Sequence, residues 1–204
     1  MNNSIRNIIF DIGNVLLYWQ PAQFLTQFTD DQNRINKFVS NVIKNSLWSN
    51  LDRGTISLEY ARNEYLAKYP EESELLTSFF SHWMEMLTPI RENIEILYEL
   101  KSNKYSLYLL SNFIKEALDF MQDRFNFFTI FDGKAISCQI KYIKPELQIY
   151  KYLITKYNLD PEECVYIDDI SPYLTQASNL KMRTIHYLPH VDLREELRKL
   201  GVKI

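Results

Sequence analysis

IRNIIFDIGNVL, residues 5–16, is the stretch that decides the fold of this chain. Its apolar run from Ile5 to Phe10 is short and stops abruptly at Asp11, which is typical of a buried parallel strand that ends at a polar turn. Ligands of open parallel sheets bind beyond the carboxyl ends of the strands. The turn that begins at Asp11 is therefore the first place to expect a functional site.

The chain after residue 87 alternates between strand-like and helix-like periods. Thr88 and Pro89 suit a helix cap followed by proline in the first turn, so we expect a helix to begin there. The patterns predict strands at 105–110, 129–131, 163–167 and 183–186, and helices at 90–103, 114–124, 145–157, 172–179 and 192–200. Repeated strand–helix units predict an α/β fold: a doubly wound, mostly parallel sheet with helices on both faces.

The intervening residues 15–87 have helical periodicity, with apolar positions from Ile35 to Ile43, a helix that Ser57 caps, and a further helix over 72–87. This stretch is too long for a simple crossover between neighbouring strands. We therefore expect 1–14 and 88–204 to form the catalytic core and 15–87 to form an inserted helical cap. Within the cap, Trp48 to Gly54 is expected to be a loop that faces the crevice and selects substrates.

Composition excludes several classes of function. The 204 residues are 46% hydrophobic, carry a formal net charge of −3 and have a pI near 5.7, so no basic field is present to gather nucleic acid or anionic lipid. No apolar run approaches membrane-spanning length and no leader pattern precedes Ile5, which favours a cytoplasmic protein without a membrane partner. Cys138 and Cys164 both lie in apolar stretches and are expected to be buried hydrophobes.

Polar residues follow each predicted core strand and should meet at one edge of the sheet. They are Asp11, Ser111 with Asn112, Lys144, and Asp168 with Asp169. Several carboxylates in one crevice recruit a cation, and Mg²⁺ binds one or two carboxylates together with water and phosphate oxygens. The Ser111 hydroxyl, the Lys144 ammonium and the amides of residues 12–14 suit a phosphoryl group. One carboxylate is then free to act as a nucleophile.

These residues resemble the four ordered motifs of the haloacid dehalogenase-like hydrolases. The matching stretches are FDIGNVL at 10–16, LLSN at 109–112, Lys144-Pro145, and YIDD at 166–169, with spacings of 100, 33 and 24 residues from Asp11 to Ser111 to Lys144 to Asp168. The form D-x-G-N-V, together with RGTIS at 53–57, is similar to a subgroup of sugar-phosphate phosphatases. The resemblance covers nearly the whole chain and implies a Mg²⁺-dependent phosphatase with a helical cap.

The resemblance also implies a role for each site residue. Asp11 would be the nucleophile and a metal ligand, the Gly13 carbonyl a second ligand, and Asp169 a third, with Asp168 bound directly or through water. Ser111 and the Asn112 amide would hold phosphate oxygens beside the backbone of Ile12 and Gly13, Lys144 would neutralise the charge on Asp11 and phosphate, and Arg53 would touch the substrate from the cap. The substrate would be a small phosphorylated metabolite, with a sugar phosphate as the first expectation.

Two departures from the family pattern leave alternatives open. Gly13 stands where most phosphatases of the family have the aspartate that transfers protons, and Tyr173 and Lys181 replace residues usual in the fourth motif. Carbon–halogen hydrolysis would use the same nucleophile without a metal, although the pair Asp168-Asp169 argues against it. A catalytically weak scaffold that binds a phosphorylated ligand or protein is the remaining alternative.

Overall fold

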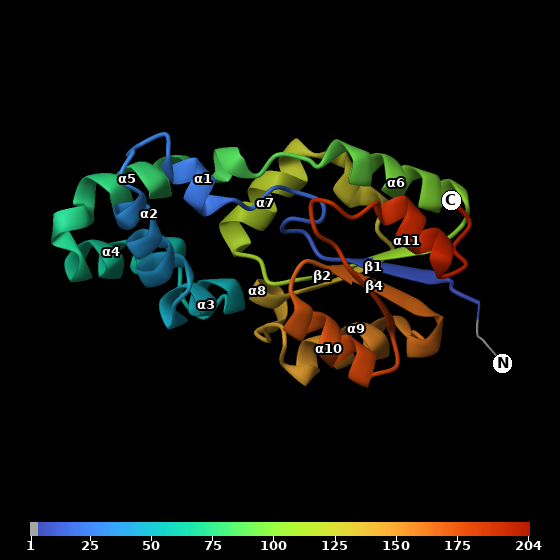
Figure 1. The fold of residues 1–204 in the computed structure, drawn as a ribbon. Coiled ribbons are helices and arrows are strands. Elements are labelled where there is room, and N and C mark those ends of the chain that lie inside the picture. The colour runs from blue at the N-terminus through green and yellow to red at the C-terminus, as the bar shows by residue number, and fades with distance from the viewer. Residues whose placement is uncertain (1–3) are drawn as a thin grey trace.

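Five parallel strands form a single sheet in the computed structural model, which describes residues 4–204 (Figure 1). The strands are β1 (Asn7–Phe10), β2 (Ser106–Ser111), β3 (Gly133–Ile136), β4 (Cys164–Asp168) and β5 (Arg183–His186), in the order β3-β2-β1-β4-β5. Phe10, at the end of the central strand, pairs with Leu109 on one side and Ile167 on the other. The residues that follow β1, β2 and β4 therefore meet at one edge of the sheet.

Helices cover both faces of the sheet, because successive strand residues point to opposite faces. Ile8 and Phe10 pack into one hydrophobic core, and Ile9 between them packs into the other. Helices α6 (Arg91–Ser102), α7 (Lys115–Arg124) and α11 (Leu193–Lys199) bury residues in the first core, and α9 (Leu147–Tyr157) and α10 (Ser171–Asn179) in the second. The predicted α/β fold with a parallel, doubly wound sheet is confirmed.

The prediction of a strand at 129–131 is wrong. Residues Asn126–Ile130 form the 3₁₀ helix η4, and β3 lies two residues further on at Gly133–Ile136. The run FNFFTIF has the aromatic and β-branched residues of a strand, but its rings stack on one another, as Phe127 does on Phe128. The edge strand instead starts at Gly133, where a Cβ atom would overlap the ring of Tyr157. Local composition therefore mispredicted which short apolar segment joins the sheet.

Helices also dominate the long stretch between β1 and α6. They are α1 (Pro21–Leu25), α2 (Gln32–Phe38), the π-helix η1 (Val39–Ile43), α3 (Ser46–Arg53), α4 (Leu58–Lys68), the 3₁₀ helix η2 (Pro70–Glu72), α5 (Ser73–His82) and the 3₁₀ helix η3 (Trp83–Met86). Figure 1 shows this group at one end of the molecule, away from both termini. Ser57 caps α4, as expected, by accepting a hydrogen bond from the Tyr60 amide.

The chain leaves and re-enters the sheet layer through two paired segments. Leu17 forms an antiparallel bridge with Pro89, and the Tyr18 amide donates to the Thr88 carbonyl. Thr88 and Pro89 are therefore not the start of a helix, since their backbone is extended here and α6 begins only at Arg91. Residues 15–17 are buried with the core, so the chain crosses at Tyr18 and Thr88. The exact bounds of the cap stay a prediction.

The segment expected to be a loop is helix α3. The side chain of Asn45 caps it by accepting from the amides of Leu47 and Trp48, and Gly54 ends it with a left-handed φ of 69°. Trp48 and Leu51 are buried along one face, which is the tertiary packing that stabilises so short a helix. Trp48 to Arg53 are consequently presented by a rigid element.

Two expectations from composition concern the molecule as a whole. The cysteines are both buried and free, as predicted. Across residues 4–204, the helices are too short or too polar to cross a bilayer.

Candidate functional site

A buried cluster of three charges lies at the carboxyl edge of the sheet. The Lys144 ammonium donates to Asp168 Oδ2 at 2.6 Å and lies 2.8 Å from Asp11 Oδ1. It also donates to the Tyr166 hydroxyl at 3.0 Å, and that hydroxyl donates in turn to Asp168. The Lys144 side chain is only 1% exposed. A lysine this deeply buried must be paired, and its two carboxylate partners supply the pairing.

Asn112 positions Lys144 in the cluster. The Asn112 side chain accepts from the Lys144 amide at 2.7 Å and donates to the Lys144 carbonyl at 3.1 Å. These two bonds join the end of β2 to the loop that precedes α9. They fix the backbone from which the ammonium reaches Asp11.

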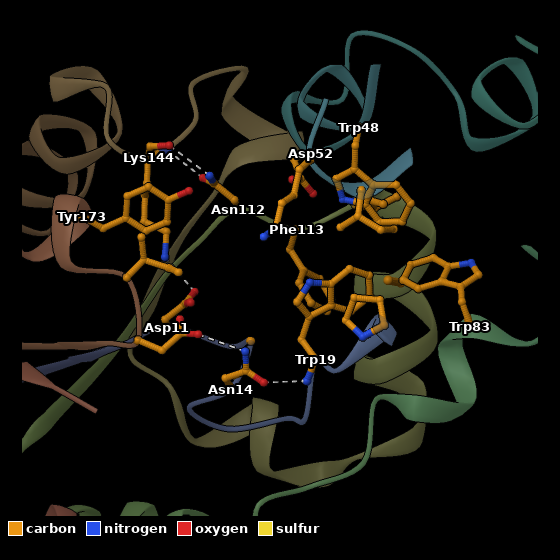
Figure 2. A pocket seen from close by; sticks show the side chains of 18 of the residues that line it. Asp11, Asn14, Trp19, Trp48, Asp52, Trp83, Asn112, Phe113, Lys144 and Tyr173 are labelled. Atoms are coloured by element: carbon orange, nitrogen blue, oxygen red, sulfur yellow. Dashed lines mark hydrogen bonds and ion pairs between the residues drawn. The ribbon is translucent and has the colours of Figure 1, made fainter. Parts of the chain in front are cut away.

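Asp169 is held on the other side of Asp11 by Asn14. The Asn14 amide side chain donates to Asp169 Oδ2 at 3.0 Å and accepts from the Trp19 amide at 2.9 Å (Figure 2). Asn14 adopts a positive φ of 51°, which asparagine tolerates better than most residues. The Asn14 side chain thus ties the turn after β1 to the end of β4 and to the start of the helical stretch between β1 and α6.

Burial shapes the electrostatics of this cluster. It raises the pKa of Asp11 to about 7, with Lys144 lowering it and the nearby Asp168 and Asp169 raising it. Burial also raises the pKa of Asp169, against a lowering by the Asn14 hydrogen bond. For Lys144, burial opposes the charged form, but the carboxylates of Asp11 and Asp168 outweigh it and raise the pKa. The carboxylates are therefore crowded, and one lysine does not satisfy all of them.

The crowded carboxylates fit a divalent cation. Asp11, Asp168 and Asp169 each offer an oxygen within 4.8 Å of the others. All-oxygen donors of this kind suit a hard ion such as Mg²⁺, which keeps several waters as well. Gly13, the expected carbonyl ligand, lines the same cavity. The residues present fit the metal that the motifs imply.

Only some of the residues expected to hold phosphate line the cavity. Gly13 and Asn112 line the cavity, whereas Ser111 is buried at the end of β2 and does not line it. The Ile12 side chain is fully buried, so only its backbone is available. The Asn14 amide is already used, since it donates to the Leu17 carbonyl at 2.7 Å. Of the turn amides predicted to bind phosphate, those of Ile12 and Gly13 are without a partner in the described part of the chain.

The cavity above the cluster has a volume of about 440 Å³ and is largely apolar. Its size is ordinary for a small-molecule site. Three tryptophans, Trp19, Trp48 and Trp83, line it from the cap side, and their rings contact one another with centroids 5.6–5.9 Å apart (Figure 2). Most of the remaining lining residues are apolar or aromatic, and two are charged: Pro21, Val39, Ile43, Phe113, Ile114, Ala117, Ile170 and Tyr173, together with Lys44 and Asp52.

Arg53 requires a correction. It was expected to touch substrate, but its guanidinium forms an ion pair with Glu146 and donates to the Lys141 carbonyl, and it does not line the cavity. The residue before it, Asp52, does line the cavity. Both residues were expected in one loop, with the substrate contact assigned to Arg53. The helical spacing from Trp48 to Asp52 puts both on one side of α3, and it could have indicated that Asp52 lines the cavity.

A parallel sheet with a buried Asp–Lys–Asp cluster at its carboxyl edge defines the protein as an α/β enzyme with a carboxylate-rich site. The family model "haloacid dehalogenase-like hydrolase" matches residues 5–171, and the chain belongs to this family of hydrolases.

Two fungal proteins have sequences similar to nearly the whole of this chain. A sesquiterpene phosphatase of Aspergillus oryzae is 22% identical over 200 residues, which cover 98% of each protein. A drimenol cyclase of Aspergillus calidoustus is also 22% identical over 200 residues, but these cover 96% of this chain and 36% of the cyclase, so the chain spans about a third of that relative.

Solved structures give the same picture of the fold. A haloacid dehalogenase family enzyme from Bacteroides thetaiotaomicron superposes with a TM-score of 0.76 at 21% identity, covering 96% of this chain and 100% of that one. The same enzyme in complex with magnesium and inorganic phosphate gives a TM-score of 0.75 with the same identity and coverage. An L-2-haloacid dehalogenase from Xanthobacter autotrophicus gives 0.65 at 16% identity, covering 98% and 85%.

Proposed function

We propose that this hydrolase is a Mg²⁺-dependent phosphomonoesterase that forms an aspartyl-phosphate on Asp11. The observation that carries the proposal is the buried cluster itself, in which Asp11 is paired with Lys144 and shares a 4.8 Å group of oxygens with Asp168 and Asp169. The similarity to a sesquiterpene phosphatase and to an enzyme solved with magnesium and phosphate supports the same reaction.

The reaction proceeds in two displacements. A carboxylate oxygen of Asp11 attacks phosphorus, the bond from phosphorus to the leaving oxygen breaks, and the alcohol departs. Water then attacks phosphorus and the bond to Asp11 breaks, which releases phosphate and restores the carboxylate. Lys144 stays within 2.8 Å of Asp11 and offsets the charge that gathers there. The amides of Ile12 and Gly13 supply donors for the phosphoryl oxygens.

Asp11, Asp169 and the Gly13 carbonyl would hold Mg²⁺, with Asp168 bound directly or through water. Bound there, the ion supplies positive charge to the phosphoryl oxygens and lowers the repulsion between them and the carboxylates. Asn14 and Lys144 orient two of these carboxylates from outside the ligand group.

The substrate that suits the cavity is a small phosphate ester of a hydrophobic alcohol. Trp19, Trp48 and Trp83 offer a hydrocarbon-binding surface next to the cluster, and ligand sites lined this way derive most of their affinity from apolar contact. The sesquiterpene phosphatase relative fits this class. Sugar phosphates, expected from the motif subgroup, would place several hydroxyls against these tryptophan rings, where a polar group without a hydrogen bond is unfavourable.

Two other functions are less well supported. A dehalogenase would have no use for the three oxygens grouped at Asp11, Asp168 and Asp169, although its fold is similar. A binding scaffold would not need a lysine buried between two carboxylates, an arrangement that is expensive unless it serves chemistry.

Phosphate release tests the proposal directly. Farnesyl phosphate, glucose 1-phosphate, 4-nitrophenyl phosphate and 2-chloropropionate are compared with Mg²⁺ and with EDTA, and Asp11→Asn is the control. We expect Mg²⁺-dependent phosphate release, greatest in kcat/KM for farnesyl phosphate, and no halide. A preference for glucose 1-phosphate would overturn the substrate class alone. Halide release, or no turnover of any phosphate ester, would overturn the phosphatase.

The aromatic wall can be tested separately with Trp19→Leu. We expect a lower kcat/KM for farnesyl phosphate and little change for 4-nitrophenyl phosphate, since only the larger leaving group extends along this wall. Tyr60→Leu, at an exposed aromatic on α4, serves as the matched control and should change neither.

A further inference from the structure

The leaving alcohol needs a proton, and Gly13 has no side chain to provide it. The oxygen of an ordinary alcohol is strongly basic, so its departure from phosphorus is slow unless an acid protonates it. An acid for this purpose must line the cavity, hold a proton near neutral pH and not be one of the metal ligands. Lys44 and Tyr173 also line the cavity, and Asp52 is the carboxyl outside the metal group among the described residues that line it.

Asp52 approaches the cavity from the cap. It lies in the last turn of α3, and Figure 2 shows it entering with Trp48 from the side opposite Asp11 and Lys144. Its carboxyl makes no hydrogen bond or ion pair within residues 4–204. A phosphate ester bound to Asp11 would have its leaving oxygen directed away from the nucleophile, because attacking and leaving oxygens are roughly in line. That direction leads toward the cap and Asp52.

Three contacts hold this end of α3 against the core. The Ser137 hydroxyl donates to the backbone carbonyl of Asp52 itself, and the Lys141 ammonium donates to the Gly54 carbonyl. Between them, Arg53 forms its two-point ion pair with Glu146. Glu146 is two residues from Lys144, so the segment that carries the lysine also anchors the helix that carries Asp52. The carboxyl is thus fixed relative to the nucleophile.

The surroundings favour the protonated form of Asp52. Burial raises its pKa to about 7, with Lys144 lowering it and Asp11 raising it. Its place in the last turn of a helix adds to this, since the negative end of the helix dipole disfavours a carboxylate. The charged and titratable groups near it are Asp11 after β1, Lys144 from the loop before α9, Tyr65 from α4, Cys138 from α8 (Ser137–Ile140) and Tyr173 from α10.

We propose that Asp52 is the proton donor to the leaving alcohol, supplied by the cap in place of the side chain that Gly13 lacks; this rests on the proposed phosphatase function. In the first displacement the Asp52 carboxyl proton passes to the leaving oxygen as its bond to phosphorus breaks, which gives the alcohol and an Asp52 carboxylate. In the second, that carboxylate takes a proton from the attacking water. Asp52 therefore ends each turnover protonated, and protons balance.

The test compares leaving groups in Asp52→Asn, which keeps the size of the side chain. General acid catalysis is worth about 10²- to 10⁴-fold, and the benefit is greatest for basic leaving groups. We expect kcat/KM for an alkyl phosphate to fall about 10²-fold or more, and that for 4-nitrophenyl phosphate to fall less than about tenfold. The fall of wild-type alkyl kcat/KM as pH rises through about 7 should disappear in the variant.

Controls separate this role from a structural one. Asn50→Ala changes an exposed residue of the same helix and should leave both substrates unaffected. Calorimetric binding of inorganic phosphate with Mg²⁺ should be unchanged in Asp52→Asn. Equal losses on both substrates, no loss on either, or weakened phosphate binding would overturn the assignment of Asp52. If the wild type hydrolyses neither ester with Mg²⁺, the proposed function itself fails.

Discussion

Arg53 and Glu146 meet face to face, with Nη1 2.9 Å from Oε2 and Nη2 2.6 Å from Oε1. This two-point pair joins the last residue of α3 to the loop that carries Lys144. Hydrogen bonding to Glu146 raises the pKa of Arg53, and the same bond lowers that of Glu146. Arg53 is next to the proposed acid Asp52, and Glu146 is two residues from Lys144. The pair therefore connects Asp52 to the cluster around Lys144.

Breaking this pair should affect the alkyl ester more than the aryl ester. Arg53 does not contact the cavity, but it holds the helix end that carries Asp52, so we expect Arg53→Ala to lower kcat/KM for farnesyl phosphate more than for 4-nitrophenyl phosphate. The pair is partly exposed, so a double-mutant cycle with Glu146→Ala should give a coupling free energy of unfolding of about 0.5–1 kcal/mol. Equal losses on the two esters would mean that the pair does not position Asp52.

Asp11→Asn should abolish turnover and preserve the fold. The amide has nearly the same volume as the carboxylate but is not a nucleophile, so we expect phosphate release to fall more than about 10³-fold. Circular dichroism should show an unchanged spectrum, since Lys144 keeps Asp168 as a partner. Turnover within tenfold of wild type would remove Asp11 from the mechanism.

Stability should depend on pH through two carboxyls whose pKa values are raised in the folded state, those of Asp11 and Asp52. Burial raises the pKa of Asp11 and of Asp52 from 3.8 to about 7, so the folded state keeps protons that the unfolded chain releases between those values. The free energy of unfolding of the metal-free protein should therefore fall as pH rises from about 4 to about 7, by up to about 1.4 kcal/mol per pH unit for each group. Asp52→Asn should flatten this fall.

Urea unfolding in EDTA at pH 5, 6 and 7.5 measures this dependence, with Asn50→Ala as the control that retains both carboxyls. Stability that rises across the same range would mean that these carboxylates are better satisfied in the folded state than their burial implies.

Asp169→Ala should weaken Mg²⁺ binding, because one hard oxygen ligand is lost. We expect the Kd from calorimetry to rise at least about tenfold, and activity to need correspondingly more Mg²⁺. Glu195→Ala, at an exposed carboxylate of α11, is the matched control. An unchanged metal titration would place Asp169 outside the metal site.

Most of the sheet, and the residues of the Asp11–Lys144–Asp168 cluster, could be predicted from the sequence because both depend on local pattern. Short apolar runs that end in Asp, Ser or Asp-Asp identify strand ends directly, and β5 was predicted at its observed bounds. Features that depend on tertiary contact were missed. The rings of Phe127 and Phe128 stack on each other instead of entering the sheet, and the Asn14 amide is satisfied by Leu17.

Asp52 was missed for the same reason. Nothing local distinguishes it from a solvated aspartate near a turn. Its position and its pKa depend on its neighbour Arg53 and on Ser137 and Lys144, which lie 85 or more residues away in the chain. Besides the helical spacing from Trp48, Gly13 was a clue: it leaves the site without an acid, which implies that another segment supplies one.

Gly13→Asp tests whether the two positions can exchange this role. A Cβ atom at Gly13 would meet only the Cβ of Trp19, at 3.6 Å, so the backbone tolerates a side chain there. In the Asp52→Asn background, the added carboxyl should restore turnover of an alkyl phosphate by about tenfold or more while changing 4-nitrophenyl phosphate little, since only the basic leaving group needs the acid. Gly13→Asn in the same background fills the same space without an acidic proton and should restore nothing. Equal recovery with aspartate and asparagine would show that the site had lacked volume, not a proton donor, and recovery with neither would mean that position 13 cannot reach the leaving oxygen in this cavity.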